Sequence, residues 1–137
     1  MKFKWGIIMA RESVICIIIV LLIFVGDVIT QNYTNDSISE ASKNLNQLRD
    51  ELIKDDAEFI ILKEKIIEIR EAWNSRHRKL AYYIEHDELE KVETDLSALY
   101  GYIDVEEYKE AVAEVDKIVY VLEHIKNKNL FNLENIF

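Results

Sequence analysis

Three histidines, His77, His86 and His124, are the side chains best suited to acid–base or metal chemistry near neutral pH. A di-iron helical bundle needs Glu-x-x-His pairs, but asparagine, tyrosine and valine stand three positions before these histidines. The best metal pair at helical spacing is His86 with Glu90, and two ligands make only a weak site. We therefore expect no metal and no cofactor.

Other catalytic signatures are also missing from the sequence. It contains no Gly-rich phosphate loop, no Gly-x-Ser-x-Gly elbow and no His-Glu-x-x-His motif. The single cysteine, Cys16, lies in an apolar stretch, so the residues after it have no thiol for a disulfide or a Cys-based zinc site. We expect that the protein is not an enzyme.

One basic run, Arg76-His77-Arg78-Lys79, could attract an anionic ligand or an acidic partner. The alternative is a solvated helix face, in which Arg76 bends to the edge or pairs with a carboxylate. Trp73, just before this run, is either a core residue or an exposed aromatic contact for a partner. Trp73, Arg76, Arg78 and Lys79 are therefore candidate interaction residues.

The C-terminal segment 130–137 is unusually apolar for a chain end, which is normally polar and loose. It either caps one end of the folded domain or inserts into a partner's groove or the membrane. Phe131, Ile136 and Phe137 are the candidate interaction residues of this segment.

Acidic residues outnumber basic ones, with 26 Asp and Glu against 17 Lys and Arg and a net charge of −9. Nucleic acid and anionic lipid headgroups both bind through clustered Lys and Arg, so such a surface should be repelled by either. We expect no nucleic-acid partner.

An uninterrupted apolar run, Val14 to Gly26, predicts a transmembrane signal anchor at 13–30 after a short cytoplasmic tail at 1–12. Thirteen residues span only about 20 Å of a roughly 30 Å hydrocarbon layer, so the helix must also use residues before Arg11. Trp5 and Tyr33 are expected as interface anchors, and Arg11 must extend its head toward the inner headgroups.

The basic residues Lys2, Lys4 and Arg11 precede the span, and the next one after it is Lys43. This asymmetry predicts a cytoplasmic N-terminus and an extracytoplasmic C-terminal domain at the cell membrane. A cleaved signal peptide is the rival interpretation, but the sequence lacks the small residues that a cleavage site requires.

A linker and stalk helix are expected at 31–55, where two Asn-x-Ser/Thr triplets match both a linker and a glycosylation acceptor. Ser37-Ile38-Ser39-Glu40 fits a capping box, and apolar residues at heptad spacing from Ile38 to Tyr83 predict one continuous helix over 37–85. The alternative is a break at Lys54-Asp55-Asp56, with Asp55-x-x-Glu58 capping a fresh helix.

A second apolar stripe, made of Ile53, Ile60 and Ile67 with Ile61 beside it, should be covered by other helices. Two further helices are predicted over 88–102, ending near Gly101, and over 105–127. Their caps are Asp87-x-x-Glu90 and Asp104-x-x-Glu107.

The predicted fold is all-α. After the transmembrane helix come a long helix and a helical hairpin, which form an antiparallel three-helix bundle within the extracytoplasmic domain at 56–137. Residues 37–55 are then a stalk or a fourth helix.

The basic start, the single span, Trp73, Ile84-Glu85-His86 and the closing Asn135-Ile136-Phe137 resemble an uncharacterised bacterial family of membrane-anchored helical proteins, domain of unknown function 4363. The resemblance covers nearly the whole chain and supplies no site residues. It implies a membrane-embedded partner, because genes of this family tend to neighbour those of a small multi-span membrane protein.

We expect a non-catalytic protein-interaction module that binds another membrane or envelope protein. One alternative is an extracytoplasmic sensor or ligand-binding domain. The other is a structural protein that self-assembles through a coiled coil of residues 37–55.

Overall fold

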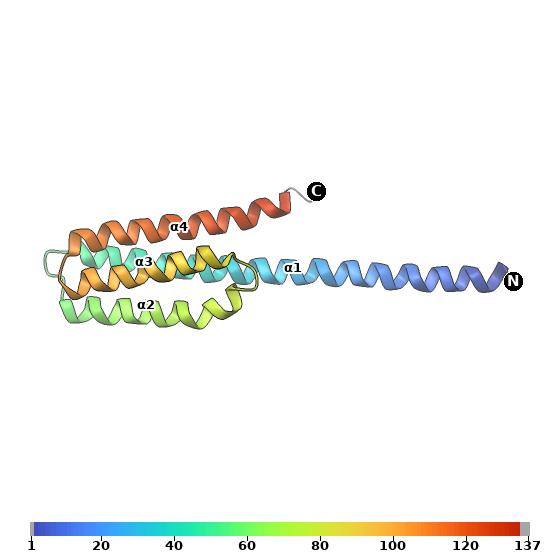
Figure 1. Cartoon of the computed structure of the whole chain (residues 1–137), viewed down its shortest axis with the longest axis horizontal. Coiled ribbons are helices and arrows are strands. Elements are labelled where there is room, and N and C mark those ends of the chain that lie inside the picture. Colours follow the sequence, from blue (N-terminus) through green and yellow to red (C-terminus); the bar gives the residue numbers. More distant parts are fainter. Residues whose placement is uncertain (1, 135–137) are drawn as a thin grey trace. The chain divides into compact units, whose positions relative to one another are not determined.

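A computed structural model describes the backbone of residues 2–134 and the side chains of residues 11–129. In this part of the chain it has four helices and no strand, which confirms the all-α prediction. The helices are α1 (Lys2–Leu52), α2 (Phe59–Leu80), α3 (His86–Asp104) and α4 (Tyr108–Glu134) (Figure 1). The chain forms two compact units, residues 1–33 and residues 34–137.

The first unit is the N-terminal part of α1. Among the described residues, α1 is the one helix long and apolar enough to cross a membrane, with a mean hydropathy of 2.8 over 18 residues and none of that window buried. Arg11 is exposed and Tyr33 is half-buried, whereas the side chain of the third predicted anchor, Trp5, lies outside the described residues.

The predicted continuous helix over 37–85 is wrong, and the alternative with a break is correct. Helix α1 ends at Leu52 and α2 begins at Phe59. The intervening turn contains backbone hydrogen bonds from Lys54 N to Glu51 O and from Ala57 N to Lys54 O. The apolar heptad pattern, which Lys54-Asp55-Asp56 interrupts, allowed both outcomes, because a straight helix and two antiparallel helices bury the same seam.

Residues 34–52 of α1 belong to the bundle as a fourth helix. Glu51 pairs with Lys65 and Glu40 with Arg76, so α1 and α2 are antiparallel. Arg49 pairs with Asp116 at 2.6 Å, and Lys126 donates a hydrogen bond to Ser39. Helices α1 and α4 are therefore antiparallel as well, and the second unit is a four-helix bundle.

The core consists of one apolar stripe from each helix, as expected for an amphipathic bundle. Nineteen of the buried apolar residues lie in the helices: Ile38, Leu45, Leu48 and Leu52 of α1, Leu62, Ile66, Ile69, Trp73 and Leu80 of α2, Leu89, Val92, Leu96, Leu99 and Ile103 of α3, and Ala111, Val115, Ile118, Leu122 and Ile125 of α4.

The predicted capping box at Ser37 is wrong. Ser37 is buried and lies inside α1, whose backbone is already helical through the segment expected to be a linker. A helix that continues from an earlier segment leaves no free backbone donors at this point, so no cap is needed. Thr34, the last residue of the first Asn-x-Ser/Thr triplet, is buried too.

The later caps are also displaced from their predicted positions. Helix α2 is preceded by Glu58 rather than Asp55, and α3 by Glu85 rather than Asp87, in both cases without a side-chain capping bond. Helix α3 runs through Gly101 to Asp104, and the residue with a left-handed backbone in the next turn is Glu106, at φ 60°. The predicted capping side chains therefore do not form these two helix starts.

Candidate interaction surface

The side of α2 that points away from the core is apolar and acidic. We call it the outer face of α2. It consists of Ile60, Ile61, Glu64, Ile67, Glu68 and Glu71. Ile60, Glu64, Ile67 and Glu71 follow one another at spacings of four and three, so they form one line along the helix. The buried residues Leu62, Ile66 and Ile69 lie on the opposite side.

The three isoleucines of this face are exposed to solvent, with exposed fractions of 68% for Ile60, 42% for Ile61 and 38% for Ile67. The prediction that other helices cover the second apolar stripe is therefore wrong within the described part of the chain. In an antiparallel four-helix bundle each helix turns one side to the core and its flanks to two neighbours. The outer side of α2 has no neighbour in this arrangement.

Basic side chains near this face are held by the flanking helices. Lys63 pairs with Asp104 of α3, and this hydrogen bond raises the pKa of Lys63. Lys65 pairs with Glu51 of α1 at 3.3 Å. Arg70 lies over the Tyr100 ring, 5.2 Å from its centroid. These three cations of α2 thus contact the flanking helices, and the charged groups of the outer face, as defined above, are its three glutamates.

On α1, Glu51 is the residue that pairs with Lys65 of α2. Hydrogen bonds from Lys54 and Lys65 hold the pKa of Glu51 below its ordinary value of 4.5. A surface groove of about 290 Å³ runs between α1 and α2 beside these residues. Its lining residues are Asn44, Gln47, Lys65, Glu68, Ile69 and Ala72. Because Glu68 lines this groove and is also part of the outer face of α2, the groove extends that face toward α1.

The candidate residues chosen from the sequence do not join this face. Trp73 is buried, so the core interpretation describes it. Arg76 pairs with Glu40 of α1, which is the carboxylate-pairing outcome considered for it. Arg78 and Lys79 are exposed near the end of α2.

Three candidates of the C-terminal segment lie outside the described residues. Ile136 and Phe137 fall beyond residue 134, and the side chain of Phe131 lies among those that the structure does not describe.

The histidines do not gather into a site. His77 Nδ1 lies 3.4 Å from Glu93, and His86 and His124 are exposed. Among the described residues, no group of three or more His, Cys, Asp or Glu side chains could hold a metal ion.

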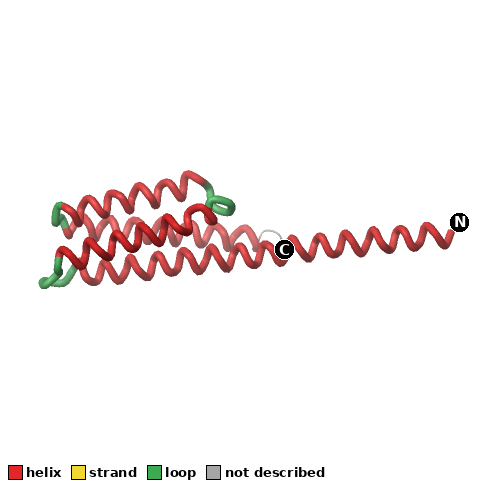
Figure 2. Tube along the Cα trace, turned by 90° about the horizontal axis from the view of Figure 1, so that it is seen from below, coloured by secondary structure: helices red, strands yellow, loops and turns green. Residues whose placement is uncertain are grey.

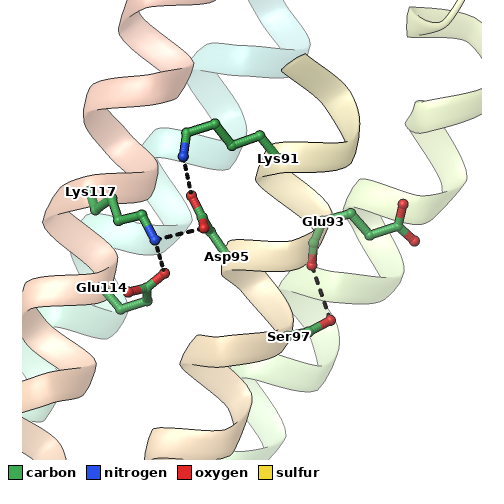
Figure 3. A network of polar contacts seen from close by, with 6 residues as sticks. All are labelled: Lys91, Glu93, Asp95, Ser97, Glu114 and Lys117. Carbon is green, nitrogen blue, oxygen red and sulfur yellow. Dashed lines mark hydrogen bonds and ion pairs between the residues drawn. The ribbon is translucent and has the colours of Figure 1, made fainter. Parts of the chain in front are cut away.

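Sequence reasoning missed one buried carboxylate, Asp95 of α3. Lys117 Nζ of α4 lies 2.7 Å from one oxygen of Asp95, and Lys91 lies 3.6 Å from the other (Figure 3). Lys117 also pairs with Glu114 at 2.9 Å, and the hydrogen bond to Asp95 is the main cause of its raised pKa. This network links α3 to α4.

A signal for this carboxylate does exist in the sequence. Asp95 stands three residues after Val92 and four before Leu99, both of which are buried, and therefore at a position of the core stripe. A carboxylate there must find a cation, because a buried charge without a partner is costly.

The family model for Domain of unknown function (DUF4363) matches residues 28–136, which include all of the bundle that the structure describes. No curated protein and no solved structure matches the chain.

Proposed function

We propose that this chain, which belongs to the family Domain of unknown function (DUF4363), is a membrane-anchored, non-catalytic module that binds another protein through the outer face of α2. In this proposal the helix near the N-terminus is a signal anchor. Lys2, Lys4 and Arg11 keep the N-terminus in the cytoplasm, so the bundle lies on the extracytoplasmic side.

The observation that carries the proposal is the exposure of three isoleucines on one side of α2. Fully burying an isoleucine side chain contributes roughly 1.5 to 3 kcal/mol. With the exposed fractions of Ile60, Ile61 and Ile67, a partner that covers all three would gain about 2 to 4 kcal/mol. That is a useful core for an interface, which commonly depends on a few apolar anchors surrounded by polar contacts.

The carboxylates on this face indicate the chemistry of the partner. Glu64, Glu68 and Glu71 lie between and beside the isoleucines. A complementary surface would present an apolar strip with Lys or Arg along its edges. A second copy of the same face would instead place carboxylate against carboxylate, which disfavours self-association through it.

The anchor limits where the partner can be found. A module held at the membrane meets other membrane or envelope proteins at high effective concentration. Such a protein, with a cationic amphipathic segment exposed on the extracytoplasmic side, is therefore the partner that this proposal names. Self-assembly through residues 37–55 would use Ile38, Leu45 and Leu52, which are already buried inside the bundle.

Site-specific photo-crosslinking of the full chain in its native membranes tests the proposal. A photoreactive residue at position 71 should give a discrete product with a different membrane protein. The same residue at position 120, where Tyr120 of α4 is exposed, should not. Ile60→Ser together with Ile67→Ser should remove the product at position 71 while the helix content stays unchanged.

Two results would count against the proposal. Equal products from positions 71 and 120 would mean that the face is not selective. A product containing two copies of this chain would favour a self-assembling protein instead.

A further inference from the structure

The turn between α2 and α3 exposes two neighbouring aromatic side chains that the proposed function does not use. Tyr82 is 81% exposed and Tyr83 is 49% exposed, and their ring centroids lie 6.3 Å apart. Leu80 and Ile84 on either side are buried. The backbone amides of Tyr83 and Ile84 both donate to Leu80 O at 2.9 Å. The turn is therefore fixed, with both tyrosines directed outward.

The ion pairs show which end of the bundle carries this turn. Lys65 pairs with Glu51, and Arg76 pairs with Glu40. The separation between the two residues on α2 equals the separation between their two partners on α1, in the opposite chain direction. Continuing from Arg76 to Tyr82 in the same register leads from Glu40 back to Thr34. Tyr82 is thus level with the first residue of the bundle. Figures 1 and 2 show the α2–α3 turn at the opposite end from the other two turns.

Chain connectivity keeps the first residue of the bundle, Thr34, close to the expected span. Thr34 follows Ile29, the last apolar residue of the expected span, by five positions. Even a fully extended chain of five residues covers only roughly 17 Å. Thr34 therefore cannot move far from the headgroup layer, and the α2–α3 turn belongs to the same end of the bundle as Thr34.

Charge is distributed unevenly along the bundle. At the end near Thr34, residues 34–40, 76–92 and 125–131 hold six Lys and Arg against six Asp and Glu. At the other end, residues 49–67 and 100–116 hold five Lys and Arg against twelve Asp and Glu. The repulsion from anionic lipid that the whole sequence predicts therefore belongs mainly to the end away from the membrane.

Carboxylates near the α2–α3 turn are partly neutralised by ion pairs. Lys128 pairs with Glu85 at 2.8 Å and with Glu88 at 3.2 Å. Arg78, which precedes the turn, is exposed. A charge-balanced surface with an exposed guanidinium can approach lipid phosphates, to which Arg binds well.

We propose that the α2–α3 turn docks on the lipid headgroup layer of the membrane that anchors the chain. Tyr82 and Tyr83 enter the interface, and Arg78 contacts phosphate. Tyrosine suits this place, because its ring is apolar and its hydroxyl is hydrogen-bonded by water and headgroups. The contact would keep the outer face of α2 at a set height above the bilayer. It does not depend on the partner proposed above.

The test uses the full chain with Cys16→Ala in vesicles, without any other protein. A fluorophore attached at Ala81→Cys, inside the turn, should be quenched by phosphatidylcholine that carries a nitroxide on its headgroup. The matched control carries the fluorophore at Val105→Cys, an exposed position in the turn between α3 and α4. We expect quenching at position 81 to exceed that at position 105 several-fold.

Substitution of both tyrosines separates docking from mere tethering. With Tyr82→Ser and Tyr83→Ser, quenching at position 81 should fall toward the control level while circular dichroism stays unchanged. Quenching that survives this change, or that is equal at positions 81 and 105, would overturn the proposal. Since no partner protein is present, this result is independent of the crosslinking outcome.

Discussion

Two substitutions of the same kind on α2 should have very different effects on the stability of the bundle. Ile66 is fully buried, whereas Ile60, six residues earlier, is 68% exposed on the outer face of α2. Changing either residue to alanine removes the same three carbon atoms. A comparison of Ile66→Ala with Ile60→Ala therefore isolates the contribution of burial.

The expected magnitudes follow from this difference in exposure. Ile66→Ala loses the full transfer free energy and leaves a cavity, which costs about 2 to 5 kcal/mol. Burying one carbon contributes about 0.8 kcal/mol. Because Ile60 is only about a third buried, Ile60→Ala loses about a third of that contribution for each of the three carbons. The higher helix propensity of alanine offsets about half of this loss. Ile60→Ala should thus change the free energy of unfolding by less than about 1 kcal/mol.

Urea unfolding of the full chain in detergent micelles measures both effects. Trp73 is buried, so the red shift of tryptophan fluorescence reports loss of the bundle core, and far-ultraviolet circular dichroism reports helix content. In the crosslinking assay the order should reverse, with Ile60→Ala weakening capture at position 71. Equal destabilisation by the two substitutions would refute the assignment of inner and outer faces to α2.

Three further outcomes are expected. Because hydrogen bonds from Lys54 and Lys65 lower the pKa of Glu51, the unfolded chain takes up a proton at this group at higher pH than the folded chain, and stability is lost as the pH falls below about 4.5. Glu51→Gln should flatten this acid limb in unfolding curves measured across pH, and an unchanged limb would contradict the ion pairs. Asp95→Asn weakens the link between α3 and α4 and should cost about 1 to 2 kcal/mol in urea unfolding, so a neutral effect would show that its lysine partners contribute nothing. Ser37→Ala should leave the thermal midpoint unchanged or raise it, because Ser37 lies inside α1; a loss of about 1 kcal/mol would instead indicate a helix cap.

Sequence periodicity predicted the last two helices of the bundle closely. The second of the predicted hairpin helices begins within three residues of the observed α4, and the first lies wholly inside α3. The apolar a and d positions Ile38, Leu45 and Leu62 are buried as the heptad pattern requires. Tyr83, placed in the same pattern, is exposed, because α2 ends at Leu80 and the pattern carries no information about where a helix stops.

The sequence predicted the apolar residues of the candidate surface but not their exposure. The second apolar stripe was recognised from Ile60 and Ile67, but its exposure depends on how many helices surround α2 and on which sides they pack. Helix α2 folds back along residues 34–52 of α1, and α4 pairs with the same segment, so the bundle closes around the first stripe and leaves the second outside. Similarly, the partner of Asp95 is Lys117, twenty-two residues away in the chain, and local spacing cannot indicate such a pair.

The sequence by itself determined the helical class, the apolar span near the N-terminus and the residues that form apolar stripes, because these depend on local composition and on a repeat of three to four residues. The tertiary structure decided where the chain reverses, which of two apolar stripes faces solvent and how charge is divided between the two ends of the bundle. These properties depend on pairings between distant segments. A folded-back helix and a straight one satisfy the same local pattern, and only the packing of α1 against α2 and α4 distinguishes them.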